Sequence, residues 1–161
     1  MKYDDASWHF ASTPECADDE RWKVAAAHIG AYLKCCLLRG WAGELHTTDE
    51  SSAEAVAAVQ SGAMSGTEFL ITYCDCKFTD EDLTEEGNAF TLYYYEGEYL
   101  GDAERVIDGQ LLTSSEEKYD SERLQRIFGQ RYSKWVSAGR PAKKTKRSWW
   151  KFWSAPPPPR R

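Results

Sequence analysis

Residues 18–39 contain the most regular apolar pattern in the chain. Apolar side chains recur there at intervals of three and four positions, namely at Trp22, Ala25, Ala26, Ile29, Leu33, Cys36 and Leu37. This spacing puts them on one face of an α-helix. Asp18 or Asp19 can cap the start of the helix, and Gly40 can end it. A helix with such a face needs other elements to cover it, so we expect it to lie in the core.

Several shorter segments also predict helices. They are residues 51–60 before Gly62, a helix after the Ser65–Glu68 capping box, residues 85–96 after Thr84, residues 101–109, and a last helix that ends near residue 136 and is capped by Asp120 or Ser121. Residues 1–18 are predicted to be irregular or extended, and residues 41–50 and 111–118 to be loops. The predicted fold is therefore mainly α, an irregular bundle of five or six helices with a minor strand at the N-terminus.

The composition indicates one folded domain. The chain has 161 residues, 42% of them hydrophobic, and no apolar run near the roughly 20 residues that span a bilayer. The N-terminus has no hydrophobic segment typical of a secretory signal. Five cysteines, two of them adjacent at Cys35 and Cys36, do not fit a disulfide framework. We therefore expect a cytoplasmic protein.

Charge divides the chain into two parts. The net charge is −6, but residues 140–161 hold eight Lys and Arg and no acid. Residues 1–139 are therefore left with 12 bases and 26 acids, a net charge of about −14. An acidic domain repels nucleic acid and favours partners with a basic protein surface. We predict a single domain over residues 1–139 that binds no nucleic acid.

Residues 140–161 read as a flexible tail, because basic residues are followed by Trp149, Trp150, Phe152 and Trp153 and then by four prolines. Three interpretations remain open. The tail is disordered without a specific contact, or it makes a weak contact with an anionic membrane surface, or its prolines form a polyproline ligand. It could also fold back on the acidic domain.

The segment 74–90, CDCKFTDEDLTEEGNAF, concentrates acidic residues. The carboxylates are Asp75, Asp80, Glu81, Asp82, Glu85 and Glu86. They can place negative charge in the first turns of two helices, which Thr79 and Thr84 cap, and this charge is favourable at a helix N-terminus. Thr79 and Asp82 would form a variant capping box. Alternatively, they form a binding surface for a basic partner. The spacing lacks the glycine and the third ligand of an EF-hand loop, which argues against calcium.

The N-terminal residues allow two interpretations. The aromatic residues of residues 1–18 can pin an arm to the core. The alternative places Asp4, Asp5, Trp8 and His9 on an edge that faces a partner, and we include these four in the predicted partner-binding set.

Residues for metal or catalytic chemistry are few. Cys74 and Cys76 could bind zinc together with His28 or His46, but the second cysteine pair of most structural zinc sites is missing. His28 lies beside the apolar face of its helix, where a histidine is usually a hydrogen-bonded packing residue. A Cys–His nucleophile has no local signature, and no established catalytic motif is present. We therefore predict no catalytic residue, no metal ligand and no cofactor.

Several motifs together resemble an uncharacterised bacterial family, a small domain of unknown function. They are MKYDDASWH, Ala27-His28-Ile29-Gly30, Ala42-Gly43-Glu44, Gly66-Thr67-Glu68-Phe69-Leu70 and KFTDEDLTEEGNAF. The resemblance covers about residues 1–136, and the tail from Arg140 departs from it. It implies a stand-alone cytosolic protein that is an immunity partner of a bacterial toxin. It brings no catalytic residues with it.

Together these features predict an immunity protein that is not an enzyme and that neutralises a cognate toxin by direct occlusion through an acidic and aromatic surface. One alternative is an enzyme that uses clustered carboxylates or a metal. Another is a membrane-surface adaptor that acts through residues 140–161.

Overall fold

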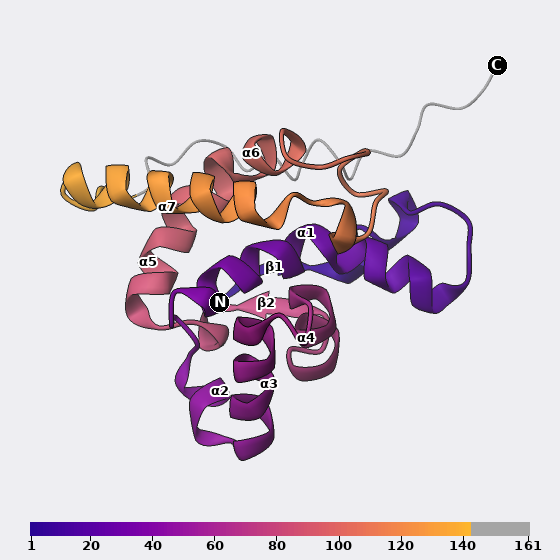
Figure 1. Ribbon diagram of the computed structural model, residues 1–161, viewed down its shortest axis with the longest axis horizontal. Coiled ribbons are helices and arrows are strands. Elements are labelled where there is room, and N and C mark those ends of the chain that lie inside the picture. Colours follow the sequence, from indigo (N-terminus) through magenta and orange to yellow (C-terminus); the bar gives the residue numbers. More distant parts are fainter. Residues whose placement is uncertain (143–161) are drawn as a thin grey trace.

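The long helix predicted from the apolar pattern is α1 (Asp18–Leu38), and the other elements pack around it. In the computed structural model, which describes residues 1–142, α1 crosses the middle of the molecule (Figure 1). Its buried face includes Ile29, Leu33 and Leu37, as the spacing predicted. Tyr32, fully buried on the same helix, contacts the rings of Phe78, Tyr94, Tyr95, Tyr99 and Phe128. The aromatic core is therefore centred on α1.

Three helices lie on one side of α1 in the lower part of Figure 1: α2 (Glu44–Thr48), α3 (Glu50–Ser61) and α4 (Gly66–Tyr73). The predicted capping box of α4 is confirmed, because Ser65 and Glu68 exchange both hydrogen bonds. The prediction of a loop over residues 41–50 was wrong, since α2 forms within it. Its first turn is stabilised by tertiary contacts, because the Gly43 N–H donates to the Asp82 carbonyl at 2.9 Å and His46 is buried.

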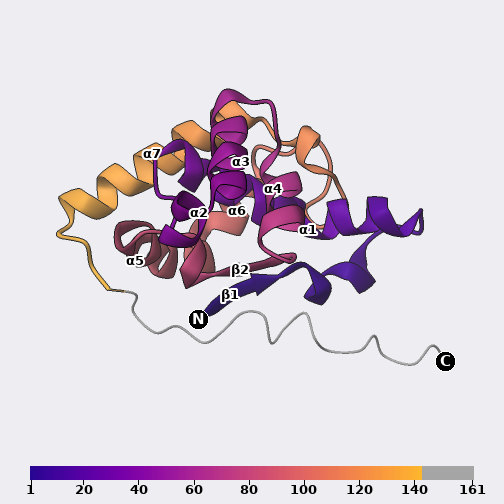
Figure 2. The same ribbon diagram turned by 90° about the horizontal axis from the view of Figure 1, so that it is seen from below.

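A small antiparallel sheet joins the N-terminus to the middle of the chain. Strand β1 (Lys2–Asp5) pairs with β2 (Lys77–Thr79), with an irregularity between Lys2 and Asp4. Figure 2 shows the two strands side by side beneath the helices. The expected N-terminal strand is confirmed, and so is the mainly helical fold. Strand β2 was not predicted, because three residues are too few to show an alternating pattern.

One helical path runs from α5 (Glu85–Tyr94) through a π-helical segment (Tyr95–Tyr99) into α6 (Leu100–Glu104). Helix α6 ends earlier than the predicted residue 109. The wider π turn allows three tyrosines to face the core, and each hydroxyl has a buried partner there. Tyr94 donates to Asp102, Tyr95 to Asp4, and Tyr99 to the His28 carbonyl.

Helix α7 (Ser121–Ser137) lies on the opposite side of α1 from α2 and α3 (Figure 1). Of the two caps that the sequence allowed, Asp120 is the one that forms, and Phe128 and Trp135 are buried. Arg140 pairs with Glu86 at 3.0 Å, and the Trp135 indole N–H donates to the Pro141 carbonyl at 3.1 Å. Contacts between the end of the described chain and the helical domain therefore extend to Pro141.

The predictions made for the tail concern mainly residues 143–161, which lie outside the described residues. Among residues 1–142, no helix combines the length and the apolar character needed to cross a membrane.

Candidate functional site

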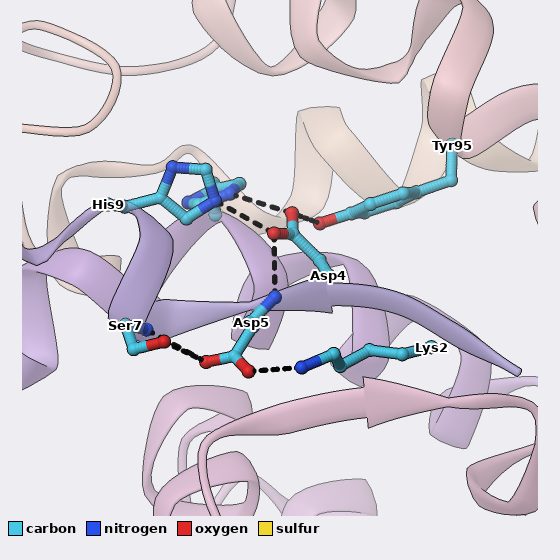
Figure 3. A network of polar contacts seen from close by, with 7 residues as sticks. Lys2, Asp4, Asp5, Ser7, His9 and Tyr95 are labelled. Carbon is cyan, nitrogen blue, oxygen red and sulfur yellow. Dashed lines mark hydrogen bonds and ion pairs between the residues drawn. The ribbon is translucent and has the colours of Figure 1, made fainter. Parts of the chain in front are cut away.

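Asp4 is the centre of a buried polar network (Figure 3). Its Oδ1 accepts the Asp5 backbone N–H at 2.8 Å and lies 2.8 Å from His9 Nε2. Its Oδ2 accepts the Tyr95 hydroxyl at 2.7 Å and lies 3.2 Å from His28 Nε2. These partners come from β1, the turns that follow it, α1 and the π segment. The network therefore ties the N-terminal arm to the core.

The protonation states within this network follow from burial and hydrogen bonding. Burial alone would raise the pKa of Asp4, but the hydrogen bonds and charges of His28 and His9 hold it well below its usual range. Burial lowers the pKa of His28, although Asp4 opposes that shift. The arrangement is thus an ionised carboxylate beside a neutral buried imidazole. His28 Nδ1 has no hydrogen-bond partner among the described residues.

A second cluster joins His46 of α2, Cys74 at the end of α4, and Asp82. Asp82 belongs to the 3₁₀ turn η3 (Asp80–Asp82). His46 Nε2 lies 2.9 Å from Asp82 Oδ1 and 3.8 Å from Cys74 Sγ. His46 and Asp82 are buried, whereas Cys74 is only partly buried. A nitrogen, a sulfur and an oxygen donor atom therefore point toward one another.

The second cluster does not have the features of an activated nucleophile. Burial, the charge of Asp82 and a hydrogen bond with Asp82 raise the pKa of the Cys74 thiol far above its usual range. The thiol is therefore protonated, whereas reactive cysteines have a lowered pKa. Ser52 Oγ lies 2.7 Å from His46 Nδ1, which puts Ser52, His46 and Asp82 in a line like that of a catalytic triad. All three side chains are buried, so Ser52 has no exposed position from which to attack a substrate.

The acidic charge is concentrated in the middle of the chain. Residues 40–104 contain 15 acids and a single base, Lys77, so their net charge of −14 equals the excess of the whole of residues 1–139. The flanking residues 1–39 and 105–139 are nearly balanced, at −1 and +1. Of the elements in this stretch, α2 and α3 project from the side of α1 opposite to α7, whereas α5 and α6 lie beside α7 (Figure 1).

Part of this charge is exposed on elements that lie next to one another. The 41–43 segment runs antiparallel to residues 82–84, with a bridge between Ala42 and Leu83. This pairing brings the start of α2 beside the starts of η3 and α5. We define the acidic face as the exposed residues Glu44, Leu45, Asp49, Glu50, Glu54, Glu81 and Glu85. Within residues 1–142, none of its six carboxylates makes a side-chain ion pair that would neutralise it.

The predicted partner-binding residues differ in burial and in pairing. Asp4, Asp5 and Asp82 are buried and bonded within the chain, so they are not available to a partner. His9 is partly buried against Asp4. Asp75, Asp80 and Glu86 pair with Lys77, the N-terminal amine and Arg140 respectively. Trp8, Glu81 and Glu85 are exposed, and Trp8 lies under the Lys2 amine at 4.9 Å.

The Thr79–Asp82 capping box explains why Asp82 faces inward. Its Oδ2 accepts the Thr79 backbone N–H at 2.6 Å and the Thr79 hydroxyl at 3.1 Å. The box was predicted from the sequence, but its consequence for the direction of the side chain was not. Ser52 and Leu45 were missed as site residues, because no local motif marks them. Tyr95, an aromatic candidate for contact with a partner, is instead buried and bonded to Asp4.

A cleft of about 560 Å³ lies between α1, the start of α4 and the segment that leads into α7. Lys23, Lys34, Thr67 and Tyr119 line it, and the hydroxyls of Thr67 and Tyr119 have no hydrogen-bond partner among the described residues. The Glu116 carboxylate already accepts the Gly66 and Thr67 backbone N–H groups, at 3.1 and 2.5 Å. The chain itself thus occupies the position at the start of α4 where an anion would bind.

Residues 2–120 match the family described as "Domain of unknown function (DUF7832)". The chain belongs to this family. The matched residues include both polar clusters and the acidic face, and they end just before α7. No curated protein and no solved structure matches the chain.

Proposed function

We propose that this DUF7832 protein is a binding protein whose acidic face covers a basic surface on a partner protein. The observation that carries the proposal is the charge of −14 confined to residues 40–104. Like charges that crowd one surface repel one another. Glu50 and Glu54, one helical turn apart on α3, are such a pair. A basic partner would offset this repulsion.

The surface also contains one exposed apolar side chain, Leu45. Leu45 is 53% exposed, whereas the other large apolar residues of this region are buried. Glu44 precedes it, and Glu81 lies close by, since the Glu81 backbone contacts Gly43. An exposed apolar side chain surrounded by charged groups is a common arrangement at protein interfaces. The carboxylates would speed association, and Leu45 would be desolvated on binding.

We propose further that the partner is a bacterial toxin and that the complex forms in the cytoplasm. The motifs that resemble a toxin-associated family support a toxin as the partner. The five cysteines, all of them free, support the cytoplasm as the place where the complex forms. Toxins that act on nucleic acid or nucleotides need basic clefts, and the acidic face has the complementary charge.

Co-expression with the product of the adjacent gene tests this proposal. The neighbour alone should arrest growth, the full chain should restore growth, and the two proteins should co-purify as a stable complex. A harmless neighbour, or rescue without any complex, would contradict neutralisation by direct occlusion.

A further inference from the structure

We propose that His46, Cys74 and Asp82 form a binding site for a zinc ion. This inference departs from the sequence-based expectation of no metal, and it does not depend on the proposed partner. The three ligand atoms, His46 Nε2, Cys74 Sγ and a carboxylate oxygen of Asp82, all lie within 4.8 Å of one another. Imidazole, thiolate and carboxylate are the three side-chain groups that zinc accepts in proteins.

The spacing of the ligand atoms fits tetrahedral coordination. Zinc bonds of about 2.3 Å to sulfur and about 2.0 Å to nitrogen or oxygen imply an S···N separation of about 3.5 Å and an N···O separation of about 3.3 Å. The corresponding separations in the structure are 3.8 Å and 2.9 Å. Small movements of these side chains would therefore admit an ion, without any rearrangement of α2, α4 or η3.

Outer-shell contacts hold the two buried ligands in place. His46 Nδ1 lies 2.7 Å from the Ser52 hydroxyl, a contact that leaves Nε2 directed at the site. Asp82 uses Oδ2 to accept from Thr79, which leaves Oδ1 facing His46. Partners of this kind, which fix the orientation of a ligand through its second polar atom, surround most metal sites.

The Asp4 cluster is also built from metal-ligand residue types, but it lacks this organisation. Each oxygen of Asp4 already accepts a hydrogen bond from outside the cluster, Oδ1 from the Asp5 N–H and Oδ2 from the Tyr95 hydroxyl. His28 Nδ1, which would need an outer-shell partner, has none among the described residues. The His46 cluster is therefore the site that the geometry favours.

Binding would exchange a proton for the metal. The Cys74 thiol loses its proton to the solvent as the sulfur–zinc bond forms, and no electron is transferred. Cys74 is the one partly buried member of the cluster, so we expect the ion to enter from its side. Three protein ligands leave a fourth position for water, which is the arrangement of zinc sites that keep one coordination position open.

Titration of the untagged full chain with Co²⁺ and Zn²⁺, after treatment with a chelator, tests the site. The wild type should take up one equivalent of Co²⁺ and develop a thiolate-to-cobalt charge-transfer band, which Zn²⁺ should abolish by displacing the cobalt. Cys74→Ser should lose the band and at least tenfold in affinity. Cys76→Ser is the matched control, because Cys76 lies two residues away and outside the cluster. Cys76→Ser should keep the charge-transfer band and the metal affinity of the wild type.

Circular dichroism and thermal unfolding show whether each variant folds. Zinc should raise the unfolding temperature of the wild type and of Cys76→Ser, but not that of folded Cys74→Ser. Asp82→Asn provides a second variant of the site. It should bind Co²⁺ at least tenfold more weakly, while cobalt bound at saturation keeps the thiolate band because Cys74 is unchanged. The proposal is overturned if the wild type takes up no stoichiometric metal. It is equally overturned if Cys76→Ser loses binding as fully as Cys74→Ser, or if Cys74→Ser binds as the wild type does.

Discussion

Gly30 of α1 and Gly66 of α4 meet so closely that neither can carry a side chain. A Cβ on Gly30 would lie within 3.0 Å of the backbone of Thr67, and a Cβ on Gly66 within 3.0 Å of the Gly30 carbonyl. The two helices are therefore in direct backbone contact. This contact positions the start of α4, and with it the chain that leads to Cys74.

Gly30→Ala should destabilise the fold by roughly 3 kcal/mol, because the clash is with backbone atoms that cannot rotate away. Urea unfolding followed by circular dichroism measures the effect. Gly101→Ala is the matched control, since a Cβ there meets nothing within 4 Å and the residue lies in α6. It should leave stability unchanged or raise it by up to about 1 kcal/mol. Equal stability of Gly30→Ala and the wild type would contradict the backbone contact.

Asp4→Asn should cost roughly 2–4 kcal/mol of unfolding free energy. The amide group replaces one carboxylate oxygen, so either the pair His28 and Tyr95 or the pair His9 and the Asp5 N–H loses its acceptor. The exposed Asp108 offers a control in Asp108→Asn, which should change stability by less than about 0.5 kcal/mol. Similar unfolding midpoints for the two variants would show that the network contributes little.

Stability should fall as the pH is lowered, in two steps of the same sign. The pKa of His28 is lowered in the fold, so the unfolded chain takes up a proton first and stability drops as the pH falls through about 6.5. The pKa of Asp4 is also lowered, so its contribution is present above about pH 4 and is lost below it. Denaturant unfolding between pH 8 and pH 3 measures both steps.

His28→Gln, which cannot titrate, provides the control for the first step. Its stability should depend less on pH between 7 and 5.5 than that of the wild type. Equal slopes for the two proteins in this range would remove His28 from the explanation.

Local signals in the sequence predicted much of the fold. The apolar pattern of α1, the Ser65–Glu68 box and the Asp120 cap each depend on residues a few positions apart. They are visible without any knowledge of the tertiary structure. Helix α2 and strand β2 were missed because they are short and depend on contacts with distant segments.

The candidate sites were harder to predict for the same reason. Asp4 and Tyr95 are 91 residues apart, and His46 and Asp82 are 36 apart, so no spacing rule links them. Asp82 illustrates the difficulty further. Its cap was predicted correctly, yet the same hydrogen bonds turn its carboxylate away from any partner. Charge, by contrast, could be counted, and an acidic surface that includes Glu81 and Glu85 was expected, whereas the acidic residues of α2 and α3 were not expected to belong to it.

The central claim is that the acidic face binds the partner. The most direct measurement is the association rate with the co-purified partner at several salt concentrations, for two triple charge reversals. One variant replaces Glu44, Glu50 and Glu81 by Lys. The other also introduces three lysines, at Glu15, Asp108 and Glu122, which are exposed outside the acidic face. The two variants therefore have the same net charge. We predict that the first variant associates at least roughly tenfold more slowly at low salt and loses most of its salt dependence, while the second changes little. Equal effects of the two variants, or no effect of the first, would contradict the claim.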